Sequence, residues 1–234
     1  MHEHVLHHIL QQLQRAAHDA GRPVPRLLAV SKTQDETAVA NLASQGQDAF
    51  GENYVQEAAA KRAALAATAA AGLALQWHLI GHLQSNKAAE AAALFDWVHT
   101  VDRPKLVTAL ARHRQAQQAP LNVLIQVNID AEDSKHGCRP EDVPALAAAI
   151  AAEPALRLRG LMVIPTPHAD PEGRRPSFRR AKALFDALAG AHPGLDTLSM
   201  GMSDDYAIAI AEGATLVRIG TALFGARAPK TAAP

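Results

Sequence analysis

Eight short apolar runs, separated by segments with helical periodicity, constrain the fold of this chain more than any other feature. The runs are mostly continuous in apolar residues, which is typical of parallel strands buried on both faces. Eight strand–helix units in this length favour one closed (β/α)8 barrel of the TIM type, so residues 1–234 are expected to form a single domain. The predicted strands are Leu27–Ser31, Ala49–Gly51, Trp77–Ile80, Trp97–Val101, Val123–Val127, Leu158–Ile164, Thr197–Met200 and Thr215–Ile219.

The segments between the runs predict helices whose ends carry sequence signals. An opening helix covers residues 5–21, where apolar side chains recur at helical spacing before a glycine. Another helix, Asp204–Glu212, lies between the last two strands, with Ser203 as its expected N-cap and Gly213 just past its end. The tail, residues 226–234, is expected to be flexible.

Composition argues against several classes of function. The chain has 23 basic and 23 acidic residues, and Arg174 and Arg175 look like an exposed loop pair, so no nucleic-acid surface is expected. No apolar run is long enough to span a membrane and no signal peptide is recognisable, which predicts a cytoplasmic protein. The single cysteine, Cys138, is expected to be an exposed, incidental thiol. His4 and His8 share a helix face but lack further ligands, so no metal site is predicted.

Glycine and hydroxyl residues follow each of the last two predicted strands. Gly201, Met202 and Ser203 come after the seventh strand, and Gly220 and Thr221 come after the eighth. Glycine lets a backbone approach an anion closely, and free N–H groups at a helix start bind it. In eight-fold barrels the loops after strands seven and eight often hold phosphate. The sequence therefore predicts a pocket for a phosphate ester.

A lysine follows the first predicted strand. Because all strands of a parallel barrel end at one mouth, Lys32 is expected to share that mouth with the phosphate loops. A desolvated lysine has a lowered pKa and can attack an aldehyde. This pairing suggests a phosphorylated aldehyde held as a Schiff base, for which pyridoxal 5′-phosphate (PLP) is the obvious candidate. The alternative is a barrel-end lysine paired with a carboxylate.

Several motifs, in this order along the chain, carry a family resemblance. Over about residues 5 to 227 the chain resembles the YggS/PROSC family of PLP homeostasis proteins. The resemblance implies a barrel of the alanine-racemase N-terminal-domain type (PLP fold type III), without the second β-domain, and PLP linked to Lys32. The motifs are LLAVSKT, FGENYVQE, WHLIGHLQSNK, VLIQVN with DSKHG, GLMVIP, and LSMGMSDDYAIAIAEGATLVRIGTALFGAR.

The resemblance also implies roles for individual residues of this sequence. The phosphate group would be held by residues of the last two strand ends, and the ring by residues nearer the second and third strands. Phosphate-binding roles fall to Ser203, Gly220 and Thr221, with Ser199, Gly201 and Met202 shaping the same turn; Arg218 would face the pyridine nitrogen, and Asn53 and His82 would lie around the ring side of the mouth.

Arg218 alternates with Val217 and Ile219 in the last strand, so its side chain is expected to enter the barrel. A guanidinium beside the pyridine nitrogen disfavours protonation of that nitrogen and leaves the ring a weak electron sink. The alternative is a structural salt bridge to a neighbouring strand. The loop residue Lys135 is either a relay for transferred aldehyde or a solvated lysine. Gln34 stands where family members often have a second lysine, which weakens a relay through that position.

Three functions remain open on the sequence. We expect a PLP carrier that takes part in intracellular PLP homeostasis and delivery to PLP-dependent apo-enzymes, acts as a monomer and has no substantial turnover. The missing second domain, the weak electron sink and an open mouth favour this interpretation. The first alternative is an amino-acid racemase. The second is a Schiff-base aldolase without PLP, but lysines of that class usually lie inside later strands.

Overall fold

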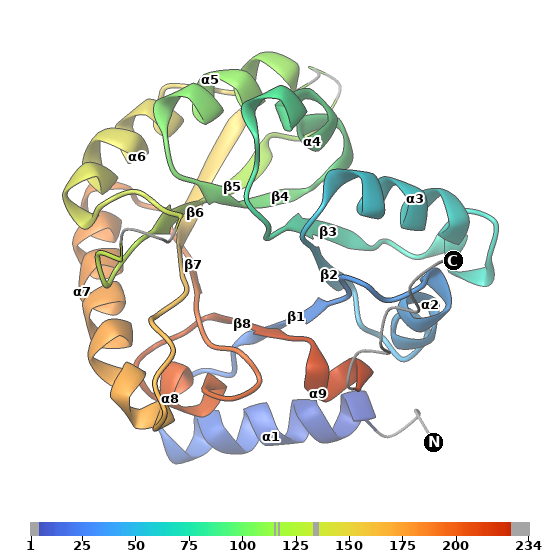
Figure 1. The fold of residues 1–234 in the computed structure, drawn as a ribbon, viewed down its shortest axis with the longest axis horizontal. Helices are drawn as coiled ribbons and strands as arrows, with labels where there is room; N and C mark the ends of the chain where they lie inside the picture. The colour runs from blue at the N-terminus through green and yellow to red at the C-terminus, as the bar shows by residue number, and fades with distance from the viewer. Residues whose placement is uncertain (1–4, 115, 117, 133–135, 226–234) are drawn as a thin grey trace, which may run out of the picture.

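The computed structural model describes residues 5–114, 116, 118–132 and 136–225, and it confirms the predicted barrel. Each strand pairs in parallel with its sequence neighbour, and the first strand pairs with the last, which closes the sheet (Figure 1). The strands are β1 (Arg26–Val30), β2 (Ala49–Glu52), β3 (Gln76–Leu79), β4 (Trp97–Val101), β5 (Leu121–Val127), β6 (Leu156–Val163), β7 (Thr197–Ser199) and β8 (Leu216–Ile219). Their ends differ from the predicted ones by at most two residues.

Helices surround the barrel on its outside (Figure 1). The α-helices are α1 (Val5–Asp19), α2 (Glu36–Ser44), α3 (Val55–Leu65), α4 (Ala88–Leu94), α5 (Pro104–His113), α6 (Val143–Ala151), α7 (Arg175–Ala191), α8 (Tyr206–Ala211) and α9 (Thr221–Phe224). Short 3₁₀ turns cover Ala69–Gly72, Ser85–Lys87, Pro140–Asp142 and Pro171–Arg174.

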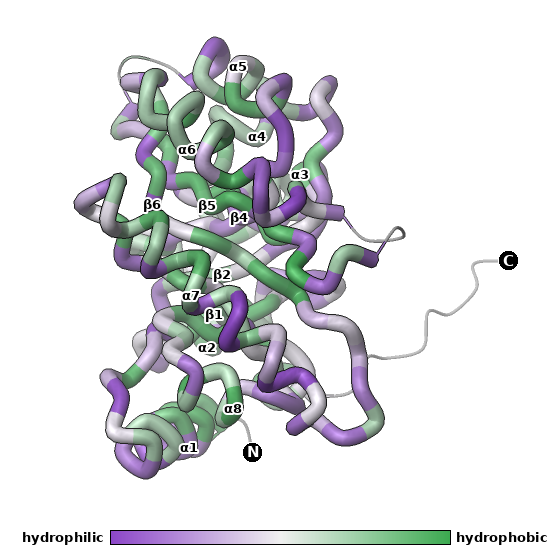
Figure 2. The backbone as a smooth tube through the Cα atoms, turned by 90° about the vertical axis from the view of Figure 1, so that its left-hand side faces the viewer, coloured by the Kyte–Doolittle hydropathy of each residue, from purple (hydrophilic) through white to green (hydrophobic). Residues whose placement is uncertain are grey.

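The main hydrophobic core lies between the barrel wall and the helices. Figure 2 shows hydrophobic stretches along β4, β5 and β6 and hydrophilic colour in the outer loops. In β1, Leu27 and Ala29 belong to this outer core, whereas Leu28 belongs to a separate cluster built from strand residues such as Leu216. Because side chains alternate along a strand, Leu28, and by parity Lys32, face the barrel interior.

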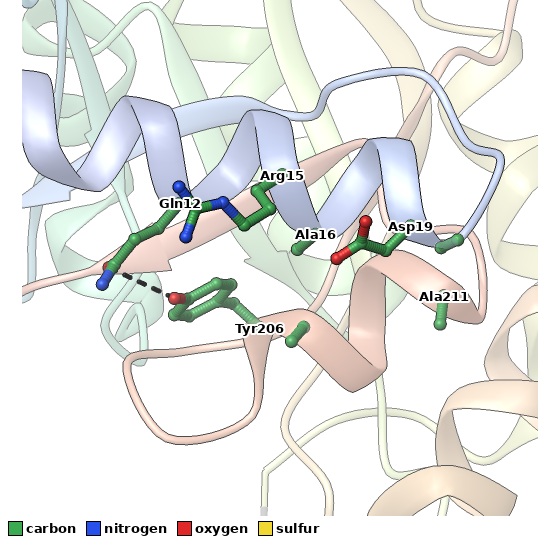
Figure 3. Close-up of a pocket in the computed structure, with 8 residues that line it drawn as sticks. Gln12, Arg15, Ala16, Asp19, Tyr206 and Ala211 are labelled. Atoms are coloured by element: carbon green, nitrogen blue, oxygen red, sulfur yellow. Dashed lines mark hydrogen bonds between the residues drawn. The ribbon is translucent and has the colours of Figure 1, made fainter.

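Helix α1 packs against α8 and α9 through its apolar face, which carries Leu6, Ile9 and Leu13. Between α1 and α8 lies a cavity of about 410 Å³, where Gln12 faces Tyr206 across the gap (Figure 3). The Tyr206 hydroxyl donates a hydrogen bond to Gln12 Oε1 at 3.3 Å. This cavity is lined by none of the predicted site residues.

Three local expectations were wrong. Ser203 does not cap the helix after β7, because α8 begins only at Tyr206 and the intervening residues form a loop. Cys138 is buried rather than exposed, and burial raises the pKa of its thiol to about 12. Arg174 and Arg175 are each held in ion pairs and are only partly exposed. Gly213 does follow α8 with a left-handed φ of +98°, as predicted.

No helix in the described part of the chain has the length and apolar character needed to cross a membrane. Among the same residues, no group of three or more His, Cys, Asp or Glu side chains is arranged to hold a metal ion. His4 lies outside the described residues.

Candidate functional site

A cavity of about 480 Å³ opens at the carboxyl ends of the barrel strands. Its volume is in the range of small-molecule sites, roughly 300–1,000 Å³. Seven of the ten predicted site residues line it, drawn from the ends of β1, β2, β7 and β8. The lining consists of Val30, Lys32, Asn53, Ile80, Ile164, Met202, Ser203, Asp204, Arg218, Gly220 and Thr221.

Lys32 reaches this cavity because it continues the inward-facing side of β1, after Leu28 and Val30. The chain turns sharply right after it. Thr33 has a φ of +65°, a left-handed conformation that a β-branched residue rarely adopts. The amine therefore projects from a strand end whose next residue is held in an unusual backbone conformation.

The loop after β7 forms the opposite wall and is held from behind by a buried carboxylate. Asp205 accepts a hydrogen bond from the Met202 N–H at 2.7 Å and forms an ion pair with Arg174, whose Nη1 lies 2.6 Å from its carboxylate. Gly201 has a φ of +92°, and a Cβ there would lie 2.6 Å from the Cβ of Ala209. Only glycine fits that turn, which lets the loop reach the cavity with its backbone.

The end of β8 supplies the second backbone wall. Gly220 passes close to β1, since a Cβ on it would lie 3.3 Å from the Val30 carbonyl oxygen. Thr221 begins α9, so its N–H and that of Ala222 have no acceptor within the helix. Thr221 and Ser203 line one cavity, and the N–H and hydroxyl of Thr221 together with the loop at Ser203 can bind a phosphate group.

Arg218 forms a charged group at the inner end of the cavity and is 4% exposed. Its Nη1 donates to the Ser199 carbonyl at 2.9 Å and to Ser199 Oγ at 2.7 Å, and its Nη2 donates to the Val163 carbonyl at 2.9 Å. Burial lowers the pKa of Arg218 to about 10, so it stays protonated near neutral pH. Within the described residues its hydrogen-bond partners are uncharged, unlike the salt bridge considered as an alternative.

A line of buried polar groups continues from Arg218 into the barrel. The Ser199 Oγ lies 3.4 Å from His99 Nδ1, and His99 Nε2 lies 2.9 Å from His78 Nδ1. Because Arg218 donates to Ser199, the serine hydroxyl can donate to His99, which then donates to His78. Burial holds the pKa of both histidines well below the usual value. Sequence reasoning missed this pair; its only signal was a histidine within each of two apolar strands.

Three predicted residues lie outside the cavity. Ser199 is buried beneath Arg218, and Gly201 shapes the loop from behind. His82 lines a neighbouring cavity of about 360 Å³ that shares Asn53 with the first. There it stacks on His136 with ring centroids 3.8 Å apart, and burial, with His136 next, lowers its pKa.

Of the two positions considered for a relay, the structure describes only Gln34. Gln34 lines a separate cavity of about 300 Å³ together with α9 residues. Lys135 lies outside the described residues.

The side chains present fit a ligand with an aldehyde, a phosphate and an aromatic nitrogen. Lys32 offers an amine on one wall, the loops at Ser203 and Thr221 offer anion-binding groups, and Arg218 offers a cation at the inner end. A Cβ at Gly201 would meet Ala209 and one at Gly220 would meet Val30, so glycine at these positions lets both loops pack closely against the rest of the barrel. A lysine after β1 and glycine-containing loops after β7 and β8 give this barrel mouth the groups that a phosphorylated aldehyde would need.

Comparison with known proteins identifies the family. Residues 5–228 match the family described as "Alanine racemase, N-terminal domain", and the chain belongs to it. It is 52% identical over 221 residues to the pyridoxal phosphate homeostasis protein of Pseudomonas aeruginosa, covering 94% of this chain and 93% of the relative. The resemblance to PLP homeostasis proteins expected from the motifs is thereby confirmed.

Solved structures agree with this assignment. PipY of Synechococcus elongatus PCC7942, whose structure has PLP bound, is 35% identical, with a TM-score of 0.82 and coverage of 96% of this chain and 100% of PipY. Alanine racemase of Clostridium difficile 630 is 15% identical, with a TM-score of 0.68, and supports the fold alone. That match covers 95% of this chain but only 57% of the racemase.

Proposed function

We propose that this protein binds PLP at the barrel mouth, linked covalently through Lys32. The observation that carries the proposal is that Lys32, Arg218 and the two glycine loops line one cavity of suitable size. The bound PLP of PipY and the name of the 52% identical relative support the choice of cofactor. When bound, PLP supplies an aldehyde that condenses with the lysine amine, forming a carbon–nitrogen double bond and releasing one water.

Different residues of the cavity bind different parts of the ligand. Ser203, Gly220 and Thr221 hold the phosphate, while Gly201 and Met202 keep the loop in shape behind Ser203. Arg218 faces the ring nitrogen and, as a cation, keeps that nitrogen unprotonated. Asn53 borders the ring, and His82 closes the neighbouring cavity.

The function we infer is PLP homeostasis and delivery to apo-enzymes in the cytoplasm, without substantial turnover. An unprotonated ring nitrogen is a weak electron sink, so carbanions next to it gain little stabilisation. Racemases share the fold, and weak amino-acid racemisation is the alternative outcome. The match to a homeostasis protein over 93% of that relative's length also supports the carrier.

Borohydride reduction tests the binding proposal. PLP-loaded protein is reduced, digested and mapped by mass spectrometry, with Lys32→Ala and the exposed Lys105→Ala as variant and control. We expect the tag on Lys32 and no tag in Lys32→Ala. A tag on another lysine would overturn the assignment, and Lys32-dependent racemisation of alanine or serine at enzyme-like rates would overturn the carrier.

A further inference from the structure

A buried ionic cluster lies behind the strand ends of β1 and β2, on the opposite side of the barrel wall from the cavity. Lys61 of α3 is 6% exposed, and its Nζ donates three hydrogen bonds. These go to the Ser31 carbonyl at 2.6 Å, Glu52 Oε1 at 2.8 Å and Glu57 Oε1 at 2.8 Å. All three ammonium protons are used. We call Ser31, Glu52, Glu57 and Lys61 the Lys61 cluster.

The Lys61 cluster forms hydrogen bonds with the residues on both sides of Lys32. On the near side, Ser31 is held twice: its carbonyl accepts from Lys61, and its hydroxyl donates to Glu52 Oε1 at 2.5 Å. On the far side, the Thr33 N–H donates to Glu57 Oε1 at 2.5 Å. The residue between them is the proposed attachment lysine, so its backbone is fixed at both ends by one group of charges.

The cluster is costly, which calls for a reason beyond packing. Taking an ammonium and a carboxylate out of water costs several kcal/mol, and burial is the main cause that raises the pKa of Glu52. Thr33 adds a left-handed backbone with a φ of +65°, a conformation that costs about 1 kcal/mol or more outside glycine. Costs of this kind persist where the surrounding structure fixes them, and they gather at functional sites.

We propose that Lys61, through Glu52 and Glu57, is a positioning residue for Lys32, and that the Lys61 cluster holds the Lys32 backbone in the geometry that loads PLP. This inference rests on the proposed function. Lys61 does not line the cavity; it acts by fixing Ser31 directly and Thr33 through Glu57. The same contacts keep Thr33 in its left-handed turn when no cofactor is bound.

The test compares Glu57→Ala with Glu57→Gln and a control. Glu57 is half-buried, so its replacement is expected to leave the barrel folded. The glutamine variant keeps an oxygen that can accept the Thr33 N–H. The control is Asp186→Ala, which removes a carboxylate bonded to a lysine four residues away on the exposed face of α7.

Two quantities are measured: amide hydrogen exchange of Thr33 in cofactor-free protein, and the rate of PLP loading followed by absorbance. We expect Glu57→Ala to speed the exchange of the Thr33 amide about tenfold and to slow PLP loading about tenfold. Loss of a hydrogen bond to a charged group has an effect of about this size. Glu57→Gln should stay within about threefold of wild type in both quantities. Lys61→Met should slow loading at least as much, once circular dichroism shows that it folds.

The outcomes separate the two proposals. If reduction of wild-type protein leaves Lys32 untagged, the proposed function is wrong and this inference is wrong with it. If Lys32 is tagged and the Glu57 and Lys61 variants load PLP at the rate of Asp186→Ala, the proposed function stands and this inference is overturned. A loss of thermal stability with unchanged loading also overturns it, because it would show a purely structural cluster.

Discussion

Arg218 Nη1 donates a 2.7 Å hydrogen bond to Ser199 Oγ, and this contact joins the cavity to the polar line inside the barrel. Both residues are buried, and β7 and β8 are neighbours in the sheet. Because the serine oxygen accepts from Arg218, its own proton is left for His99, 3.4 Å away. The orientation of the guanidinium is therefore coupled to groups that never reach the ligand.

Replacing Ser199 by alanine should weaken PLP binding by about tenfold. The change removes one charge-assisted hydrogen bond from Arg218 and leaves its backbone contacts, so the guanidinium is held less firmly; such a bond contributes about 1.5–3 kcal/mol. Titration with PLP measures the dissociation constant. The exposed Ser44→Ala, on α2, serves as control and should bind as wild type. Equal affinities for both variants would show that Ser199 does not orient Arg218.

The buried histidine pair should make the protein less stable as the pH falls below about 6.5. Burial holds the pKa of His78 and His99 well below the usual value, so the unfolded chain takes up protons that the native chain does not. The free energy of unfolding therefore keeps its full value above about pH 6.5. Below that pH it falls by about 1.4 kcal/mol per pH unit for each histidine. Urea unfolding between pH 5 and 7 measures the slope.

A His78→Asn variant isolates one member of the pair. The asparagine oxygen can take the place of Nδ1 and accept from His99, while the titrating ring is gone. Its slope should be smaller than that of wild type by about 1.4 kcal/mol per pH unit. His82, whose pKa is also lowered, still titrates in both proteins and cancels in the comparison. An unchanged slope would mean that His78 takes up a proton in the folded protein.

Two adjacent arginines allow a matched test of the β7 loop. Arg174 pairs with Asp205, which is 1% exposed and holds the Met202 N–H, whereas Arg175 pairs with Glu172 and Glu212. Arg174→Ala leaves the Asp205 carboxylate buried without its ion pair, which typically costs about 3–5 kcal/mol. We expect it to lower both stability and PLP affinity, and Arg175→Ala to change affinity by less than about twofold. Calorimetric titration with PLP distinguishes them.

The strand order and the gathering of the candidate residues at one cavity could be predicted from the sequence because both follow from local patterns. Continuous apolar runs mark strands of a closed parallel sheet, and the ends of such strands meet at one mouth. This is why Lys32 and Thr221, almost two hundred positions apart, could be assigned to one cavity. The N-cap at Ser203 was wrong because Asp204 and Asp205 offer the same capping chemistry, and the chain uses Asp205 to fix the loop instead.

The line of buried polar groups inside the barrel and the Lys61 cluster could not be predicted, because each depends on how distant elements pack. A histidine inside an apolar strand gives no sign of the neighbour it will face, and the contact between His78 and His99 depends on the register of β3 and β4. Lys61 lies in an alanine-rich helix whose polar positions look solvated. Only the packing of α3 against β1 and β2 turns that lysine toward Ser31.

Gly201→Ala should destabilise the protein because the new Cβ would collide with Ala209, and Gly46→Ala is the control in which no such collision occurs. Both glycines have similar left-handed φ values, +92° and +99°, so an alanine is strained to a similar degree at each. A Cβ at position 46 has open space, whereas a Cβ at position 201 would lie 2.6 Å from Ala209. Overpacking of this kind costs about 1–3 kcal/mol, which should appear as the difference between the two variants in urea unfolding. Because Gly201 precedes Met202 and Ser203, Gly201→Ala should also weaken PLP binding while Gly46→Ala should not; equal stabilities of the two variants would show that the loop can move away from α8 at no cost.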